Sequence, residues 1–368
     1  MCGHRIGKDD KRLVINRIKM DKAVEKAKQD NYQYGIALLK VFMCFLVVCK
    51  HFWHSNECGY FLGKELLLYS KAMVNAVFMI LTFLFCEKGL STNSVTWIQK
   101  RMERLIVPQI AWTFVYGLVL YLLYIVFRTD KIAPADIFWQ LFLGHSEKVN
   151  PTMWFQVVLI WITVLFMGVI KVFPRIHNYV LFLIGVAALL AEYSGVTLFL
   201  KQYRYELQYP LGRFVEMIPL AVFGFMTSRY ELLPRLKKER FVTGILSIII
   251  ITIDYNWCCF STTEGFGTTG VKPIIIGGCF VILAYCFPIE NMPDRFKVLL
   301  STISRFTMGI YCSHRLVAKL LHGLMSKYNV PIEKGSIQEC IVIYVIAYLC
   351  CWFGYELFRN TRIKRIFE

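Results

Sequence analysis

The chain has 368 residues, of which 57% are hydrophobic and only 18% are charged, and its mean hydropathy is +0.50. Soluble globular proteins carry about 25% charged residues, so this composition excludes that class and indicates an integral membrane protein. The formal net charge of +17 raises the question of nucleic acid binding. In a membrane protein, however, basic residues first indicate which side of the membrane each loop faces.

Apolar stretches long enough to cross a bilayer alternate with polar breaks along the chain. A membrane helix needs about 20 apolar residues, and about ten such stretches can be placed here. They cover residues 35–54, 66–86, 105–127, 154–173, 179–200, 211–227, 241–257, 271–288, 299–322 and 337–358. The sequence therefore predicts an all-α fold, a polytopic transmembrane helical bundle of about ten spans.

The remaining residues are short polar segments. Residues 1–33 are basic and lack an apolar run, so they are interpreted as a cytoplasmic N-terminal segment and not as a cleavable signal peptide. Within them, residues 11–28 suit either a helix on the membrane surface or a solvated helix. The predicted organisation continues with a transmembrane domain over residues 34–358 and a basic cytoplasmic tail over residues 359–368.

The distribution of Lys and Arg predicts the orientation of the bundle. If the N-terminus is cytoplasmic, the inside loops carry 26 of the 42 basic residues and the outside loops carry eight. Positive charge concentrates in cytoplasmic loops, so both termini are predicted to be cytoplasmic. Topology and contact with anionic membrane lipids then explain the basic excess, and no nucleic acid partner is expected.

The thirteen cysteines form no pattern typical of a metal site or a disulfide framework. Most lie within or at the ends of apolar spans, where cysteine behaves as a small hydrophobic residue. Near the outer face, Cys58, Cys258 and Cys259 leave an outer disulfide open as an alternative. No metal is predicted.

Charged side chains inside membrane spans are costly, so they are candidate functional residues. In the first span, Lys40 and His51 are eleven positions apart, which places them on one helix face with an axial separation of about 16 Å. A buried cation thus lies below an imidazole that can take a proton near neutral pH. Alternatively, His51 belongs to an interfacial aromatic belt, and Lys40 pairs with a buried acid such as Glu216.

Two arginines precede the third predicted span. Arg101 and Arg104 are three positions apart and are neighbours on one helix face. Two guanidinium groups held together suit phosphate, whose oxygens arginine binds in pairs. The alternative is that they anchor the cytoplasmic end of the helix. Three lysines near span ends are interpreted as reaching to the interface: Lys50, Lys272 and Lys319.

Further candidates lie in later spans. His314, with Tyr311 one helical turn before it, is predicted in the outer half of the ninth span, either to orient a substrate or His51, or as a core histidine bonded to a neighbouring helix. Arg213 and Glu216 are three apart and form either a mutual ion pair or part of a polar cavity. Trp154 near the outer surface either stacks on a sugar ring or is an interfacial aromatic.

With these motifs in this order, the sequence resembles the acyltransferase-3 family of integral membrane acyltransferases. That family has a basic residue followed roughly three helical turns later by His in its first helix, and an Arg-x-x-Arg at the start of its third. Here Lys40 with His51 matches the first motif, and Arg101 with Arg104 matches the second. Shorter likenesses follow: Met153-Trp154-Phe155, Ile218-Pro219, Phe223-Gly224, Ile303-Ser304-Arg305-Phe306, Gly309-Ile310-Tyr311 and His314.

One departure from the family pattern lies in the second span. The family usually has Phe-Phe-x-x-Ser-Gly there, whereas this chain has Thr82-Phe83 at the last two positions. A large aromatic residue thus replaces a small one. We expect helix packing or a substrate groove to differ at this place, which bears on the acceptor more than on the chemistry.

The resemblance implies transfer of an acyl group, most often acetyl, from cytoplasmic acetyl-CoA or another acyl-CoA to a hydroxyl group. The acceptor would be a cell-envelope glycan or a lipid-linked sugar, and the location would be the bacterial cytoplasmic membrane. Arg101 and Arg104 would bind the coenzyme A phosphates, with Lys40 guiding the donor. His51 would act as general base or briefly carry the acyl group.

Two other classes of function remain open from the sequence. A transporter or flippase for an acyl donor or a lipid-linked sugar would use the buried charges as a pathway and would move its substrate without forming an ester. A non-catalytic scaffold or sensor would tolerate replacement of all the residues of the two motifs.

Overall fold

The computed structural model describes residues 33–52, 63–92, 94–127, 132–194, 205–260, 270–286, 292–328 and 335–368. The chain divides into two units, Met1–Tyr34 and Gly35–Glu368. Almost all of the first unit, including the predicted surface helix over residues 11–28, lies outside the described residues. Of the cysteines that could form an outer disulfide, Cys58 lies outside the described residues as well. For Cys258 and Cys259 the backbone is described but the side chains are not. The fold below is that of the second unit.

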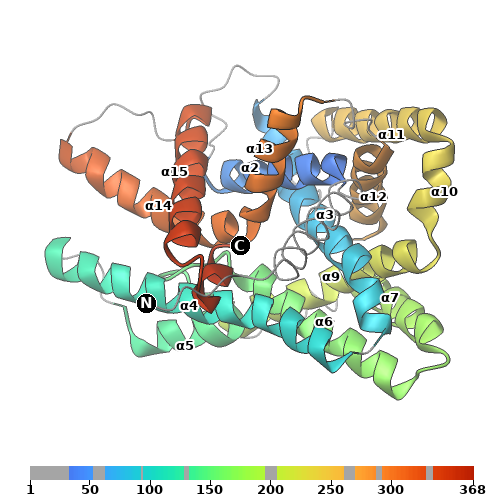
Figure 1. Cartoon of the computed structure of the whole chain (residues 1–368), viewed down its shortest axis with the longest axis horizontal. Helices are drawn as coiled ribbons and strands as arrows, with labels where there is room; N and C mark the ends of the chain where they lie inside the picture. The colour runs from blue at the N-terminus through green and yellow to red at the C-terminus, as the bar shows by residue number, and fades with distance from the viewer. Residues whose placement is uncertain are drawn as a thin grey trace, which may run out of the picture. The chain divides into compact units, whose positions relative to one another are not determined.

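The described part of the chain is helical and contains no strand, which confirms the predicted all-α fold (Figure 1). Every predicted span overlaps at least one helix. The helices are α2 (Tyr34–Phe52), α3 (Gly63–Ser91), α4 (Val95–Phe127), α5 (Pro134–Leu143), α6 (Trp154–Val172), α7 (His177–Tyr193), α9 (Tyr205–Arg229), α10 (Leu232–Lys238), α11 (Arg240–Phe260), α12 (Val271–Cys286), α13 (Asp294–Arg305), α14 (Thr307–Tyr328), α15 (Ile337–Leu357) and the 3-10 helix η2 (Arg362–Ile366).

Six helices within the described residues are long and apolar enough to cross a membrane. They are α2, Met73–Ser91 of α3, Val95–Val126 of α4, α6, Pro210–Arg229 of α9 and α15. Helices α7 and α12 are apolar but shorter. Large apolar side chains are exposed along α4, α7, α11 and α15, as expected of a surface that faces lipid. These features indicate an integral membrane protein, while the count of ten spans and the cytoplasmic termini remain predictions.

The predicted span over residues 299–322 differs from the structure, because two helices replace it. Helix α13 ends at Arg305 and α14 begins at Thr307. At the junction, the Ser304 hydroxyl donates to the carbonyl oxygen of Ser301, and the Thr307 hydroxyl donates to that of Ser304, both at 3.1 Å. Such side-chain bonds compete with continuation of the helix. Phe306 between the two helices is buried and packs against aromatic rings of α15.

Helices α3, α6 and α9 pack tightly around the residue that departs from the family pattern. Gly224 of α9 lies so close to α3 that a Cβ there would be 2.3 Å from the carbonyl oxygen of Ile80. Phe83 of α3 is buried, and its ring centroid lies 4.7 Å from that of Phe166 in α6. The Phe166 ring in turn lies 5.5 Å from Phe225 in α9. The aromatic residue therefore fills space between three helices and does not line the cavity described next.

Candidate active site

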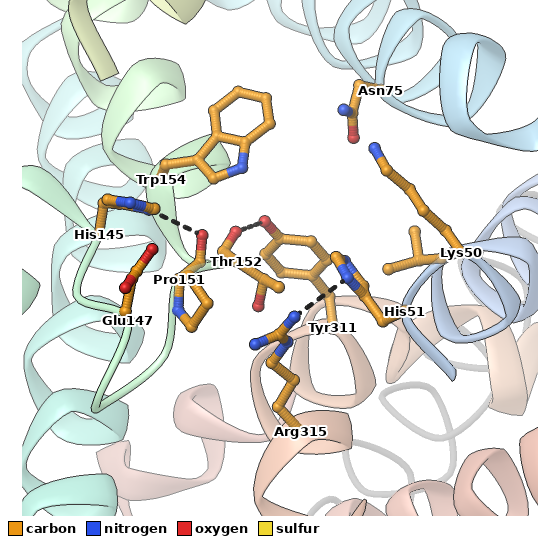
Figure 2. A pocket seen from close by; sticks show the side chains of 11 residues that line it. Lys50, His51, Asn75, His145, Glu147, Pro151, Thr152, Trp154, Tyr311 and Arg315 are labelled. Carbon is orange, nitrogen blue, oxygen red and sulfur yellow. Dashed lines mark hydrogen bonds between the residues drawn. The ribbon is translucent and has the colours of Figure 1, made fainter. Parts of the chain in front are cut away.

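A cavity of about 380 Å³ lies where α2, α3, α14 and the connection from α5 to α6 meet (Figure 2). That connection, residues 144–153, is called the 144–153 loop, and it closes the cavity together with the first residue of α6. Polar lining residues include Lys50, His51, Asn75, Glu147, Trp154 and Arg315. Groups that can donate, accept and exchange protons thus share a small space.

His51 lies in the last turn of α2 and faces this cavity. Nη2 of Arg315 lies 3.4 Å from Nδ1 of His51 (Figure 2). A guanidinium group can only donate, so Nδ1 is the acceptor, and the neutral ring carries its proton on Nε2. Nδ1 is therefore the basic nitrogen of His51, and a cation lies beside it.

The imidazole of His314 is stacked on that of His51, with ring centroids 5.4 Å apart and an interplanar angle of 28°. His314 is completely buried. Its Nδ1 donates to the carbonyl oxygen of Tyr311 at 2.6 Å, because a carbonyl can only accept. No hydrogen-bond partner for its Nε2 is found among the described residues. The ring of Phe52 in α2 also lies near that of His314, with centroids 6.0 Å apart. His314 thus contacts two rings of α2, and its predicted role in orienting His51 stays a prediction.

A buried network of hydrogen bonds holds the 144–153 loop against α14. The backbone N–H of Asn150 donates to the side chain of Gln140 in α5 at 3.1 Å. The Asn150 side chain accepts from the N–H and the hydroxyl of Thr152 and donates to the carbonyl oxygen of Cys312 at 3.4 Å. The Tyr311 hydroxyl donates to the carbonyl oxygen of Thr152. Tyr311 therefore lines the cavity with its hydroxyl already engaged in positioning the loop.

Trp154 at the start of α6 forms one group with Arg213 and Glu216 of α9. Arg213 and Glu216 make the predicted ion pair, with Nη1 and Oε2 2.6 Å apart. The Arg213 guanidinium lies 5.5 Å from the centroid of the Trp154 ring, within the range of a cation–π contact. Trp154 is buried and lines the cavity. Glu216 is thus paired with Arg213. The contacts do not support the alternative prediction that Lys40 pairs with Glu216.

Lys40 lies apart from the cavity. It is partly buried on α2, eleven residues or about 16 Å before His51, and it is not among the lining residues. One turn further along, the Cys44 thiol lies 3.4 Å from the carbonyl oxygen of Thr307, at the beginning of α14. The structure therefore places Lys40 near the level at which α14 begins and not beside the imidazole.

Arg101 and Arg104 lie in the first turns of α4. Arg101 is partly buried, and neither its Nε nor its Nη2 has a hydrogen-bond partner within the described part of the chain. Arg104 is exposed. Twelve residues beyond Arg104, or about 18 Å along α4, the Tyr116 hydroxyl bonds α14 by donating to Cys312 and accepting from the Leu316 N–H. The arginine pair is thus separated from the level of the cavity by that length of helix.

Sequence reasoning missed several residues of the cavity. Lys50, interpreted as reaching to the interface, points its amino group toward Asn75 of α3 (Figure 2). Asn75 is buried in an apolar helix, and such a polar residue is a signal that could have been used. By contrast, no local pattern marks His145 and Glu147, because hydrogen bonds to α14 determine the path of their loop.

Comparison with known proteins bears on the class of chemistry. The acyltransferase-3 family model, described as an acyltransferase domain, matches residues 33–356. No curated protein and no solved structure matches the chain. The match covers almost all of the helical part, including both arginines of α4, His51 of α2 and the cavity lining. The chain therefore belongs to the acyltransferase-3 family of integral membrane acyltransferases.

Proposed function

We propose that this protein transfers an acyl group, acetyl foremost, from cytoplasmic acyl-CoA to a hydroxyl group of a cell-envelope glycan or lipid-linked sugar, in the bacterial cytoplasmic membrane. The observation that carries the proposal is His51 in a polar cavity, with the Arg315 guanidinium on Nδ1 and the His314 ring stacked on it. A positioned base with a cation beside it suits acyl transfer to a hydroxyl, because the base takes the proton and the cation stabilises the developing oxyanion.

In direct transfer, the Arg315 guanidinium first releases Nδ1 of His51, because the single lone pair of this nitrogen cannot accept from Arg315 and from the substrate at once. The acceptor hydroxyl then gives its proton to Nδ1 as its oxygen attacks the thioester carbonyl carbon. Negative charge develops on the carbonyl oxygen, and the cations Arg315 and Lys50 of the same cavity stabilise it. The carbon–sulfur bond then breaks, and the thiolate of coenzyme A takes the proton from His51. The products are an ester and free coenzyme A.

In the acyl-carrier route, Nδ1 of His51, likewise released by Arg315, itself attacks the carbonyl carbon. The thiolate leaves and takes the Nε2 proton, which leaves a neutral acyl-imidazole. The acceptor hydroxyl then receives the acyl group and returns a proton to the ring. The His314 ring stacked on His51 holds the imidazole in one orientation during either route.

The donor is proposed to bind at the beginning of α4. Arg101 has guanidinium nitrogens without partners among the described residues, and Arg104 is exposed beside it, so both suit the phosphates of coenzyme A. The separation of about 18 Å along α4 from Arg104 to Tyr116 calls for a ligand with a long arm. The phosphopantetheine chain of acyl-CoA is such an arm. Lys40, near the level where α14 begins, would neutralise charge along its path.

The experiment is acetyl transfer from labelled acetyl-CoA into envelope glycan by membranes that contain the wild type, His51→Ala or the control His177→Ala. We expect His51→Ala to lose at least about 100-fold in rate, the usual contribution of a general base or nucleophile. His177 lies at the start of α7, away from the cavity, so its variant should retain activity. Full activity of His51→Ala would contradict the assigned role, and sugar movement without a new ester would favour a flippase.

A further inference from the structure

A short segment around η2 joins three helices of the bundle. This η2 segment, Thr361–Phe367, follows α15 and lies against α4 and α15 (Figure 1). Its residues Ile366 and Phe367 belong to the apolar cluster that contains Trp112 of α4 and Cys312 of α14. Nothing in the proposed chemistry uses this segment, although it touches both the helix with the donor arginines and the helix with Arg315.

Phe367 occupies a space left by two glycines, Gly309 and Gly354, and this space is called the Phe367 seat. A Cβ on Gly309 of α14 would lie 2.3 Å from the carbonyl oxygen of Phe367, and a Cβ on Gly354 of α15 would lie 2.4 Å from its ring. The ring also stacks on Phe358, with centroids 6.1 Å apart and an interplanar angle of 4°. Because any larger side chain at either glycine would displace Phe367, the two helices leave room for this residue.

Two further contacts attach the segment to α4. The indole Nε1–H of Trp112 donates to the carbonyl oxygen of Ile366 at 3.0 Å. Arg365 makes an ion pair with Glu103, the residue immediately before Arg104 and two positions after Arg101. The segment is therefore attached to α4 at the arginine pair itself.

Two other contacts hold the first turns of α4: Trp97 near their start, and the buried Leu105 after Arg104, whose carbonyl oxygen accepts from Nε2 of Gln156 in α6 at 2.7 Å. Between these two residues the helix is open. Val95 is 67% exposed, and most side chains up to Arg104 are exposed or half-buried. Trp97 packs on Gly89 of α3, where a Cβ would lie 1.9 Å from the indole ring. Helical turns with few buried contacts open easily unless another part of the chain fixes them.

We infer that the η2 segment is a positioning element for the acyl donor, which fixes Arg101 and Arg104 relative to α14 through Glu103–Arg365 and the Phe367 seat. This inference rests on the proposed function, because it assumes that the two arginines bind the donor. Glu103, Arg365 and Phe367 are positioning residues, and none of them lines the cavity. Their loss should weaken donor binding and leave the chemical step almost unchanged.

The test uses the full chain in lipid nanodiscs and breaks the segment in two chemically different ways. Arg365→Gln removes the ion pair, and we expect a rise of about fivefold in the calorimetric Kd for coenzyme A and in the KM for acetyl-CoA, with kcat within about twofold. Phe367→Ala empties the glycine seat without changing charge and should raise both constants by about tenfold. Arg365→Lys and Phe367→Leu should remain close to the wild type.

The matched control is Glu356→Gln, which breaks the more exposed Arg359–Glu356 pair, 3.7 Å long, at the end of α15. It should change neither constant. Amide hydrogen exchange over residues 95–104 is measured on the same samples and should speed up only in Arg365→Gln and Phe367→Ala.

The inference is overturned if both variants bind coenzyme A like the wild type, or if kcat falls while KM stays constant. A wild type that binds coenzyme A but transfers no acyl group would instead contradict the proposed function. The binding and exchange measurements would still decide the role of the segment in that case.

Discussion

The two stacked imidazoles of His51 and His314 have different hydrogen-bond partners, and we propose different roles for them. His51 has the Arg315 guanidinium at Nδ1, so this nitrogen accepts. His314 donates from its own Nδ1 to the helix carbonyl of Tyr311 and is completely buried. A proton acceptor for the substrate must reach the cavity, and of the two rings only His51 lines it. We propose that His314 contributes a flat surface against which the His51 ring rests.

This difference predicts the behaviour of two substitutions at one position. His314→Phe keeps an aromatic surface on His51, so acetyl transfer should remain within about threefold of the wild type. His314→Ala removes the stacking surface and leaves space in which the His51 ring can turn, so the rate should fall by about tenfold. Rates measured with labelled acetyl-CoA in membranes check this. A His314→Phe variant as inactive as His51→Ala would show that His314 takes part in the chemistry.

At the scale of elements, one wall of the cavity is a loop that buried hydrogen bonds hold in place. The 144–153 loop begins at Gly144, which caps α5 with a φ of 65°. That conformation is costly for residues with a side chain. A Cβ there would also lie 2.6 Å from the carbonyl oxygen of Met153, at the other end of the loop. The loop can therefore close on itself and present His145 and Glu147 to the cavity only because residue 144 is glycine.

We expect Gly144→Ala to lower the free energy of unfolding by about 1–3 kcal/mol, because it combines a strained backbone with a contact to main-chain atoms. Acetyl transfer should fall as well, since the loop forms one wall of the cavity. Gly168→Ala in α6 is the matched control: nothing lies within 4 Å of its added Cβ. In a helix interior this change should stabilise by about 0.5–1 kcal/mol. Thermal unfolding of both purified variants measures the difference, and equal stabilities would contradict this account of Gly144.

At the scale of the whole molecule, contacts join residues that the charge distribution assigns to the same side of the membrane. Arg365 of the predicted cytoplasmic tail contacts Glu103, which lies between Arg101 and Arg104 in the segment predicted to be inside before the third span. On the predicted outside, Lys319 lies near the outer end of the ninth predicted span, and Lys148 lies in the segment before the fourth. The Nζ of Lys319 donates to the carbonyl oxygen of Lys148 at 3.1 Å. These contacts agree with the predicted alternation of sides. Which face is cytoplasmic depends on the positive-inside rule alone and stays a prediction.

Thiol labelling of intact cells tests that orientation. Glu147→Cys places an exposed thiol in the 144–153 loop, and Glu239→Cys places one between α10 and α11. With a membrane-impermeant maleimide we expect added labelling of Glu147→Cys in intact cells, and of Glu239→Cys only after the membrane is opened. The wild type provides the background, because it has cysteines of its own. The reverse pattern would mean that the bundle is inserted the other way round.

The sequence predicted the parts of the site that depend on spacing within one helix. The Arg213–Glu216 pair follows from a separation of three positions. The prediction that Lys40 and His51 share one helix face also followed from spacing. A shared helix face does not imply a shared cavity, however, and of these two residues only His51 lines the cavity. The sequence analysis assigned no role to Arg315, because its approach to His51 joins residues 264 positions apart. No local pattern encodes such a contact.

By itself the sequence determined the helical membrane class and the family, because hydropathy, helix length and short motifs are local properties that survive in any correct fold. The tertiary structure decided which of the charged residues share a cavity, that Phe83 fills a space between helices, and that the η2 segment reaches Glu103. The physical reason is that these outcomes depend on the packing of helices distant in sequence and on the path of one hydrogen-bonded loop. Both emerge only when the whole chain has folded.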